Sequence, residues 1–198
     1  MRATAILSIA LALSSTSSSS MAQSNAPFTL QEKQGPNAVG LKLVEQYDYS
    51  RTFQPLIDAL GKPYQGERAR PLQTLIWYPA QKRNAKPMTF GDYVAFQATE
   101  TTFDKPKNRT GMEAMFIASM KPVFQKPMWA TRDAALAPGK FPVIIYAPSF
   151  SSVSWENVDL CEYLASYGYV VIAAPGMGVT RESTHDVAGT TAQALDIS

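Results

Sequence analysis

The amino-acid sequence predicts an α/β fold built around parallel strands. Two runs, "PVIIYA" at 142–147 and "YVVIAA" at 169–174, carry almost no polar residue on either parity, which is typical of strands covered on both faces. The segment between them, residues 154–168, has apolar residues at helical spacing, with Ser154 as the expected N-cap and Gly168 suited to the C-terminal cap. Strand, helix and strand in this order predict a right-handed crossover between two parallel neighbours.

Two further strands are expected upstream of this unit. Residues 39–49 alternate between apolar and polar side chains, and residues 70–80 form a second strand that is ended by Pro79. The connection between them is rich in turn residues, so we expect an antiparallel pair at an edge of the sheet. Residues 186–198 begin another helical pattern. Without further strands, we expect the strand at 169–174 to have an unpaired edge that favours aggregation.

The segment 81–137 has the least regular pattern in the chain. Two stretches within it, 88–100 and 110–121, show helix-like spacing. The second repeats apolar residues at offsets of three, four and eight, namely Met112, Met115, Phe116 and Met120. A short helix with this face on the core explains the repeat more simply than a methionine-lined binding surface does.

Composition and charge exclude several classes of function. The 198 residues include 18 basic and 16 acidic side chains, and the basic ones form no stripe, which argues against nucleic-acid binding. A single cysteine, Cys161, and a single histidine, His185, cannot form an internal disulfide or a zinc-type cluster, so no metal is expected. Cys161 lies among helical apolar positions and is predicted to be a buried thiol.

The first 22 residues have the three parts of a secretory signal. One basic residue precedes a short apolar stretch, and the small residues Ser20 and Ala22 precede the expected cleavage site. The apolar stretch is too short to span a bilayer, and no cysteine is available there for a lipid anchor. We therefore expect a secreted or periplasmic protein without a stable membrane anchor. Residues 23–38 would be a flexible N-terminal arm before a domain at 39–198.

A turn rich in hydroxyl groups, "APSFSS", follows the first apolar run. Ligands of open parallel sheets bind beyond the carboxyl ends of the strands, and this turn leads into the N-terminus of a helix. Its backbone N–H groups are fit to hold an anion or a developing oxyanion. Capping of the helix by Ser152 and Ser154 would by itself explain those two hydroxyl groups.

The stretch "GKFPVIIYAPSFSSVSWENVDLCEYLASYGYVVIAAPGMG" resembles the third strand, first major helix and fourth strand of α/β-hydrolases. It is most similar to the dienelactone-hydrolase-like and platelet-activating-factor acetylhydrolase-like esterases, through "LASYGYVV" at 164–171 above all. The two upstream strands resemble the opening strands of these esterases, whereas the segment 81–137 does not. The resemblance implies the N-terminal part of an α/β-hydrolase sheet with an insertion at about 81–137. Its antiparallel edge pair would be followed by parallel strands with crossover helices.

The resemblance also implies a chemistry. These esterases hydrolyse carboxylic esters through an acyl-serine, without a metal or organic cofactor, and a residue after a His-Gly pair lends its backbone N–H to the oxyanion. Carried over, Phe150 is that donor, with Ser151 beside it. The sequence departs from the pattern, because Pro148 and Ser149 replace His-Gly and Ser151 replaces the second glycine. Ser149 and His185 would lie at the rim of the site.

No complete catalytic triad is found in the sequence. The pentapeptide G-x-S-x-G is absent, and the family order places nucleophile, acid and histidine beyond His185. A substitute triad of Ser151, His185 and Asp186 needs a geometry that adjacent histidine and aspartate side chains seldom adopt. The sequence therefore predicts an inactive, truncated N-terminal fragment of an exported esterase whose parent takes a small-molecule or lipid-like ester. The alternative is a non-catalytic periplasmic binding or interaction protein on a hydrolase-like scaffold.

Overall fold

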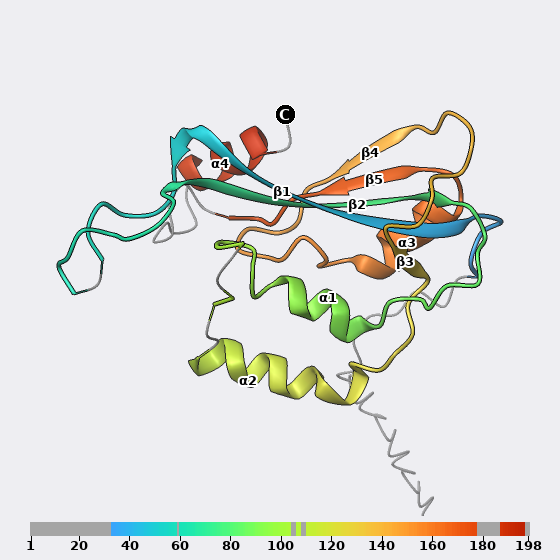
Figure 1. Cartoon of the computed structure of the whole chain (residues 1–198), viewed down its shortest axis with the longest axis horizontal. Helices are drawn as coiled ribbons and strands as arrows, with labels where there is room; N and C mark the ends of the chain where they lie inside the picture. Colours follow the sequence, from blue (N-terminus) through green and yellow to red (C-terminus); the bar gives the residue numbers. More distant parts are fainter. Residues whose placement is uncertain (1–32, 59, 104–105, 108–109, 178–186, 197–198) are drawn as a thin grey trace, which may run out of the picture.

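A five-stranded mixed sheet forms the centre of the molecule (Figure 1), with the strand order β3-β1-β2-β5-β4. The structure is a computed structural model, and it describes residues 33–58, 60–103, 106–107, 110–177 and 187–196. The strands are β1 (Ala38–Thr52), β2 (Ala69–Ala80), β3 (Ala130–Arg132), β4 (Val143–Tyr146) and β5 (Val170–Ala173). This sheet with its flanking helices confirms the predicted α/β fold class.

The two apolar runs form the predicted parallel pair. β4 and β5 lie side by side, with Val143 opposite Val170 and Tyr146 opposite Ala173. The crossover between them contains the helix α3 (Val158–Ser166). The turn after β4 and the loop after β5 therefore lie next to each other, at the carboxyl ends of the two strands, because both strands run in the same direction.

The helix α3 is shorter at its start than the sequence pattern predicts. Ser154 is not its N-cap: the helix begins after Asn157, and the fully buried hydroxyl of Ser154 has no hydrogen-bond partner. Residues before Asn157 form turns instead, since they follow the bend that leaves β4. The end of the helix agrees with the prediction, because Gly168 follows it with a φ of 98°, in the left-handed region that favours glycine.

The antiparallel pair of β1 and β2 is confirmed, but neither strand lies at the edge. A strand that the sequence did not predict, β3, pairs parallel with β1 outside it. At the other end of the sheet, β5 lies between β2 and β4, so the expectation of an unpaired edge on 169–174 is wrong. The helix α3 packs on β1 and β2 as well as on β5. The chain that leaves it therefore enters the sheet between β2 and β4. The two edge strands of the sheet are β3 and β4.

The two faces of the sheet are covered differently. The face towards α3 carries the core, which includes the fully buried side chains of Leu41, Leu75, Trp77, Cys161 and Val171. The opposite face is bare beside β4, where Val143 is 58% and Ile145 is 55% exposed. The prediction that both faces of the two apolar runs are covered is therefore wrong for β4. In Figure 1, α1 and α2 lie below the sheet and α4 (Val187–Asp196) lies above one end of it.

The two helices predicted within 81–137 are present, but they pack differently. The helix α1 (Phe90–Phe96) starts at a capping box of Thr89 and Asp92 and buries three side chains. The helix α2 (Gly111–Met120), continued by the 3-10 turn η1 (Lys121–Val123), buries Ile117 alone.

The prediction that the apolar repeat of α2 packs on the core is confirmed for Met120, which is half-buried against the core, and is wrong for the other three residues. Met112 is 87% and Phe116 is 60% exposed, and Met115 is exposed as well. The apolar side chains of this helix point to several sides instead of forming one stripe, so the burial of Ile117 leaves Met112 and Met115 outside.

The described part of the predicted arm is attached to the end of α3. The backbone N–H of Asn37 donates to the carbonyl of Ser166 at 3.1 Å, and that of Gly35 donates to the Ser166 hydroxyl at 2.9 Å. The expected signal and cleavage site lie outside the described residues. Within the part of the chain that the structure describes, no helix is long and apolar enough to cross a membrane.

Candidate functional site

The turn after β4 is locked to the loop after β5. The backbone N–H of Ser151 donates to the carbonyl of Gly176 at 2.5 Å, and the N–H of Gly176 donates to the carbonyl of Ser152 at 2.8 Å. A Cβ at Gly176 would lie 2.2 Å from the carbonyl oxygen of Ser149, so a residue with a side chain cannot keep this spacing. The turn and the loop therefore form one unit at the carboxyl edge of the sheet.

Ser151 has an unusual backbone conformation within this turn. Its φ of 59° lies in the left-handed region, which costs a residue with a Cβ about 1 kcal/mol or more. The resemblance places the second glycine of the esterase turn at this position. The serine thus adopts a conformation that glycine would adopt without strain, and the reciprocal bonds to Gly176 hold it there.

Glu156 is a site residue that the sequence analysis did not identify. Its Oε2 accepts hydrogen bonds from the backbone N–H of Ser149 and from the hydroxyl of Tyr146, both at 2.9 Å. Partial burial raises the pKa of Glu156, but hydrogen bonds from Ser149, Ser152 and Tyr146 outweigh burial and leave the pKa below its usual value. The turn therefore holds an anion in this structure, and the anion is the protein's own carboxylate.

The structure places three of the four predicted site residues in this turn. Ser149 and Ser151 are exposed, and Phe150 between them is half-buried. The N–H of Ser151 donates to Gly176, so this donor can serve an oxyanion only if that bond opens. The role of Phe150 and Ser151 as donors stays a prediction. His185, with the substitute triad that includes it, lies outside the described residues.

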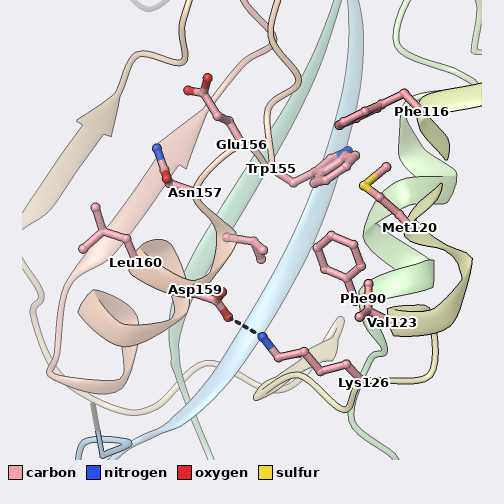
Figure 2. Close-up of a pocket in the computed structure, with 11 residues that line it drawn as sticks. Phe90, Phe116, Met120, Val123, Lys126, Trp155, Glu156, Asn157, Asp159 and Leu160 are labelled. Atoms are coloured by element: carbon pink, nitrogen blue, oxygen red, sulfur yellow. Dashed lines mark hydrogen bonds and ion pairs between the residues drawn. The ribbon is translucent and has the colours of Figure 1, made fainter. Parts of the chain in front are cut away.

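An apolar pocket lies beside the turn, between α2 and the start of α3 (Figure 2). The pocket has a volume of about 210 Å³. Glu156 and an ion pair between Lys126 and Asp159 at 3.3 Å line its polar side. Aromatic and other apolar side chains form the remaining walls, among them Phe90, Phe116, Met120, Val123 and Trp155. Glu156 belongs to both the pocket and the turn, so the two are adjacent.

A buried ion cluster holds the other side of the loop after β5. Arg70 of β2 donates from Nε and Nη2 to the carboxylate of Asp196, at 2.6 and 2.5 Å, and from Nη2 to the carbonyl of Met177 at 3.2 Å. Arg51 of β1 reaches the same carboxylate at 2.9 Å. In addition, Gln193 of α4 donates to the carbonyl of Pro148. The end of α4 is thereby fixed to β1, β2 and the turn.

A second buried carboxylate, Glu162, holds the elements that carry the pocket. Its Oε1 accepts from the Tyr93 hydroxyl at 2.7 Å and from the backbone N–H of Ala130 at 3.0 Å, and its Oε2 accepts from the N–H of Trp129 at 2.7 Å. Tyr93 in turn accepts from the indole N–H of Trp77 at 3.0 Å. Burial raises the pKa of Glu162 to about 6 in spite of these donors. The network connects α3 to α1 and β3.

The sheet order, the antiparallel opening pair and the donor-lined turn after β4 together define a hydrolase-like α/β sheet. The structure resembles a ferulic acid esterase from Streptomyces cinnamoneus, with a TM-score of 0.50 and 20% sequence identity. The match covers 81% of this chain and 39% of the esterase, so the chain spans about two fifths of the length of that enzyme. At this identity the likeness shows the fold.

Neither the known protein families nor the curated sequences give a match. No family model matches the sequence, and no curated protein matches it. Among the residues that the structure describes, no three histidine, cysteine, aspartate or glutamate side chains are grouped so as to hold a metal ion.

Proposed function

We propose that this chain is the N-terminal part of an exported serine hydrolase that acts on carboxylic esters, and that it does not turn over esters by itself. The observation that carries the proposal is the turn after β4. This turn binds the carboxylate of Glu156 through a backbone N–H of Ser149, at the carboxyl edge of a hydrolase-like sheet. Both a carboxylate oxygen and the oxyanion of an ester transition state are stabilised by hydrogen-bond donors held in fixed positions.

In the parent enzyme, the donors of the turn would stabilise the charge that develops on the ester carbonyl oxygen. A serine oxygen would attack the carbonyl carbon, and a histidine would take the serine proton and pass it to the leaving alkoxide. The sequence contains no G-x-S-x-G for that serine. The donors of Ser149 and Ser151 are engaged within the protein, so substrate binding would exchange these bonds for bonds to the ester.

The bare side of β4 supports a larger sheet. Val143 and Ile145 are exposed on the face opposite α3. The same face has a hollow lined by Ile76, Leu136 and Val170, among others. Folded proteins seldom leave an apolar edge and face uncovered. A further strand beside β4, with helices over the bare face, would cover both.

The exposed edge predicts association of the chain when it is expressed alone. We expect residues 23–198 to form oligomers or aggregates, and Ile145→Lys to reduce this, because a charge on an edge strand opposes pairing. Leu60→Lys is the matched control, since Leu60 is 80% exposed but lies outside the sheet. Size-exclusion chromatography with light scattering measures the effect. A monomeric wild-type chain with a sharp thermal transition would contradict the fragment proposal.

A second candidate is a non-catalytic periplasmic binding or interaction protein. The internal bonds of the turn favour it, because the N–H groups of Ser149 and Ser151 already donate to Glu156 and Gly176. A turn in this state is closed to a substrate oxyanion.

Hydrolysis of p-nitrophenyl acetate separates the two candidates. The fragment proposal expects no turnover by residues 23–198 and turnover by a longer product of the same reading frame that includes a G-x-S-x-G serine. Turnover by the chain alone, abolished by Ser151→Ala, would overturn the proposal. A reading frame that adds no such serine, together with cooperative unfolding of the chain, favours the binding protein.

A further inference from the structure

We propose that the apolar pocket between α2 and the start of α3 binds a small, uncharged aromatic compound that carries a hydrogen-bond acceptor, such as an aryl ketone. The pocket goes beyond the proposed ester hydrolysis. Its outer walls come from α1, α2 and η1. These elements belong to the segment 81–137, to which the sequence resemblance to esterases does not extend.

The first observation is a buried hydrogen-bond donor without an acceptor. Trp155 is only 5% exposed, and its indole Nε1–H has no hydrogen-bond partner. Nearly all buried donors in native proteins are paired. Figure 2 shows the indole close to Phe90, Phe116 and Met120, with its nitrogen on the side towards α2. An ordered water needs two to four polar partners, which rings and a thioether do not supply. The geometry therefore calls for an acceptor on a ligand.

The second observation is the shape and chemistry of the walls. The rings of Phe90 and Trp155 meet edge to face, with centroids 5.6 Å apart and an interplanar angle of 89°. Aromatic rings and the thioether of Met120 both contact a further ring favourably. A dry cavity of about 150 Å³ accommodates benzene, so about 210 Å³ leaves room for one ring with a short substituent. These walls favour a flat ring over a long chain.

The third observation is the exposure of Phe116. Its side chain forms a wall of the pocket and is nevertheless 60% exposed, on a helix whose Met112 and Met115 are also exposed. A ligand in the pocket would cover the inner side of this ring. Two members of the apolar repeat of α2, Phe116 and Met120, would then serve the pocket.

The charges around the pocket decide the charge of the ligand. Lys126 is paired with Asp159, so neither has a free charge to offer. The carboxylate of Glu156 stays ionised because the turn donates to it. The polar side of the pocket is therefore net negative and disfavours an anion, whereas the orphan indole donor disfavours a ligand without an acceptor.

Three probes of equal size test the proposal. Acetophenone has the ring and the acceptor, α-methylstyrene replaces the carbonyl oxygen with a methylene group, and 2-octanone keeps the carbonyl on a linear chain. The chain carries Ile145→Lys, which lies on the opposite face of the sheet, so that it stays monomeric. The readout is the indole N–H signal of Trp155 in ¹H–¹⁵N spectra, identified as the signal that Trp155→Phe removes.

We expect acetophenone to shift this signal saturably, and to bind about tenfold more tightly than α-methylstyrene and 2-octanone. Equal binding of α-methylstyrene would show that the donor is not used and would overturn the proposal. Tighter binding of 2-octanone would identify an acyl-chain pocket instead. An unmoved Trp155 signal, or indole signals without native dispersion in the ligand-free chain, would also overturn it.

Two variants on the same helix locate the site. Phe116→Ala removes one wall and should weaken acetophenone binding about fivefold or more. Met112→Ala is the matched control, because Met112 is 87% exposed and does not line the pocket. We expect no change in affinity for the control. Equal losses in the two variants, or no loss in Phe116→Ala, would place the ligand elsewhere.

Discussion

Glu156 and Glu162 lie six positions apart, and each accepts a hydrogen bond from a tyrosine hydroxyl, together with one backbone N–H at Glu156 and two at Glu162. Their pKa values nevertheless move in opposite directions. Burial raises the pKa of Glu162 to about 6, whereas the donors around the half-buried Glu156 outweigh burial and lower its pKa. Donors of the same kind can therefore surround either a carboxylate that stays ionised or a buried carboxyl that keeps its proton to a higher pH. The depth of burial decides which of the two pKa shifts results.

The largest expected effect is on Glu162. Glu162→Ala leaves two backbone N–H groups and the Tyr93 hydroxyl without their acceptor in the core, and should reduce the free energy of unfolding by about 3 kcal/mol. Glu162→Gln, which keeps an acceptor oxygen, is the matched control and should lose less. Urea unfolding in the Ile145→Lys background measures both. A loss below about 1 kcal/mol in Glu162→Ala would mean that the network is not formed.

The raised pKa of Glu162 predicts a dependence of stability on pH. The folded state holds this proton more tightly than the unfolded chain, whose carboxyl has a pKa of 4.5. The contribution is therefore complete below pH 4.5 and is lost as the pH rises through about 6, by about 2 kcal/mol. Unfolding curves of the wild type and Glu162→Gln should diverge in this window. Parallel curves would contradict a raised pKa.

The two tyrosines give a smaller and paired test. Tyr93→Phe leaves the indole N–H of Trp77 without its acceptor and removes one donor to Glu162 in the core, so it should lower stability by about 1.5 kcal/mol. Tyr146→Phe removes the corresponding hydroxyl from Glu156, and water can replace it there, so the loss should stay below about 0.5 kcal/mol. Equal losses would show that burial does not distinguish the two carboxylates.

A small global effect is expected at Glu156 as well. Glu156→Ala should cost about 1 kcal/mol or less, because its carboxylate is half-buried. The local effect should be larger: the amide of Ser149 loses its acceptor, and its hydrogen exchange should become at least tenfold faster. Glu156→Gln keeps an acceptor oxygen and should exchange more slowly than the alanine variant. Unchanged exchange of the Ser149 amide in Glu156→Ala would show that Glu156 does not accept its hydrogen bond.

Local pattern and strand direction could be predicted from the sequence, because they depend on near neighbours. The pair at 142–147 and 169–174 was found from its unbroken apolar runs, and Gly168 from the need for a left-handed cap. Their order in the sheet could not be found in this way, since it depends on where α3 packs. The helical repeat that begins at Met112 predicted a helix, but periodicity alone does not say whether its apolar side chains contact the core, a pocket or solvent.

The candidate site was predicted only in part for a similar reason. The turn after β4 followed from its position between a strand and a helix. Glu156 lies within residues 154–168, which the sequence pattern predicts as one helix, and only the bend after β4 brings its carboxylate to Ser149. The ion pair of Arg70 with Asp196 joins residues 126 positions apart, and no local pattern contains such a contact.

The spacing between the turn and the loop depends on a single absent methyl group. At position 176, a Cβ would meet the carbonyl oxygen of Ser149 at 2.2 Å, so alanine there must act as a wedge. The added Cβ would break the hydrogen bond from the backbone N–H of Ser151 to the carbonyl of Gly176, and the N–H would then face outward. One carbon atom would thus change this turn from one whose N–H of Ser151 is paired within the protein into one whose N–H is open to a ligand.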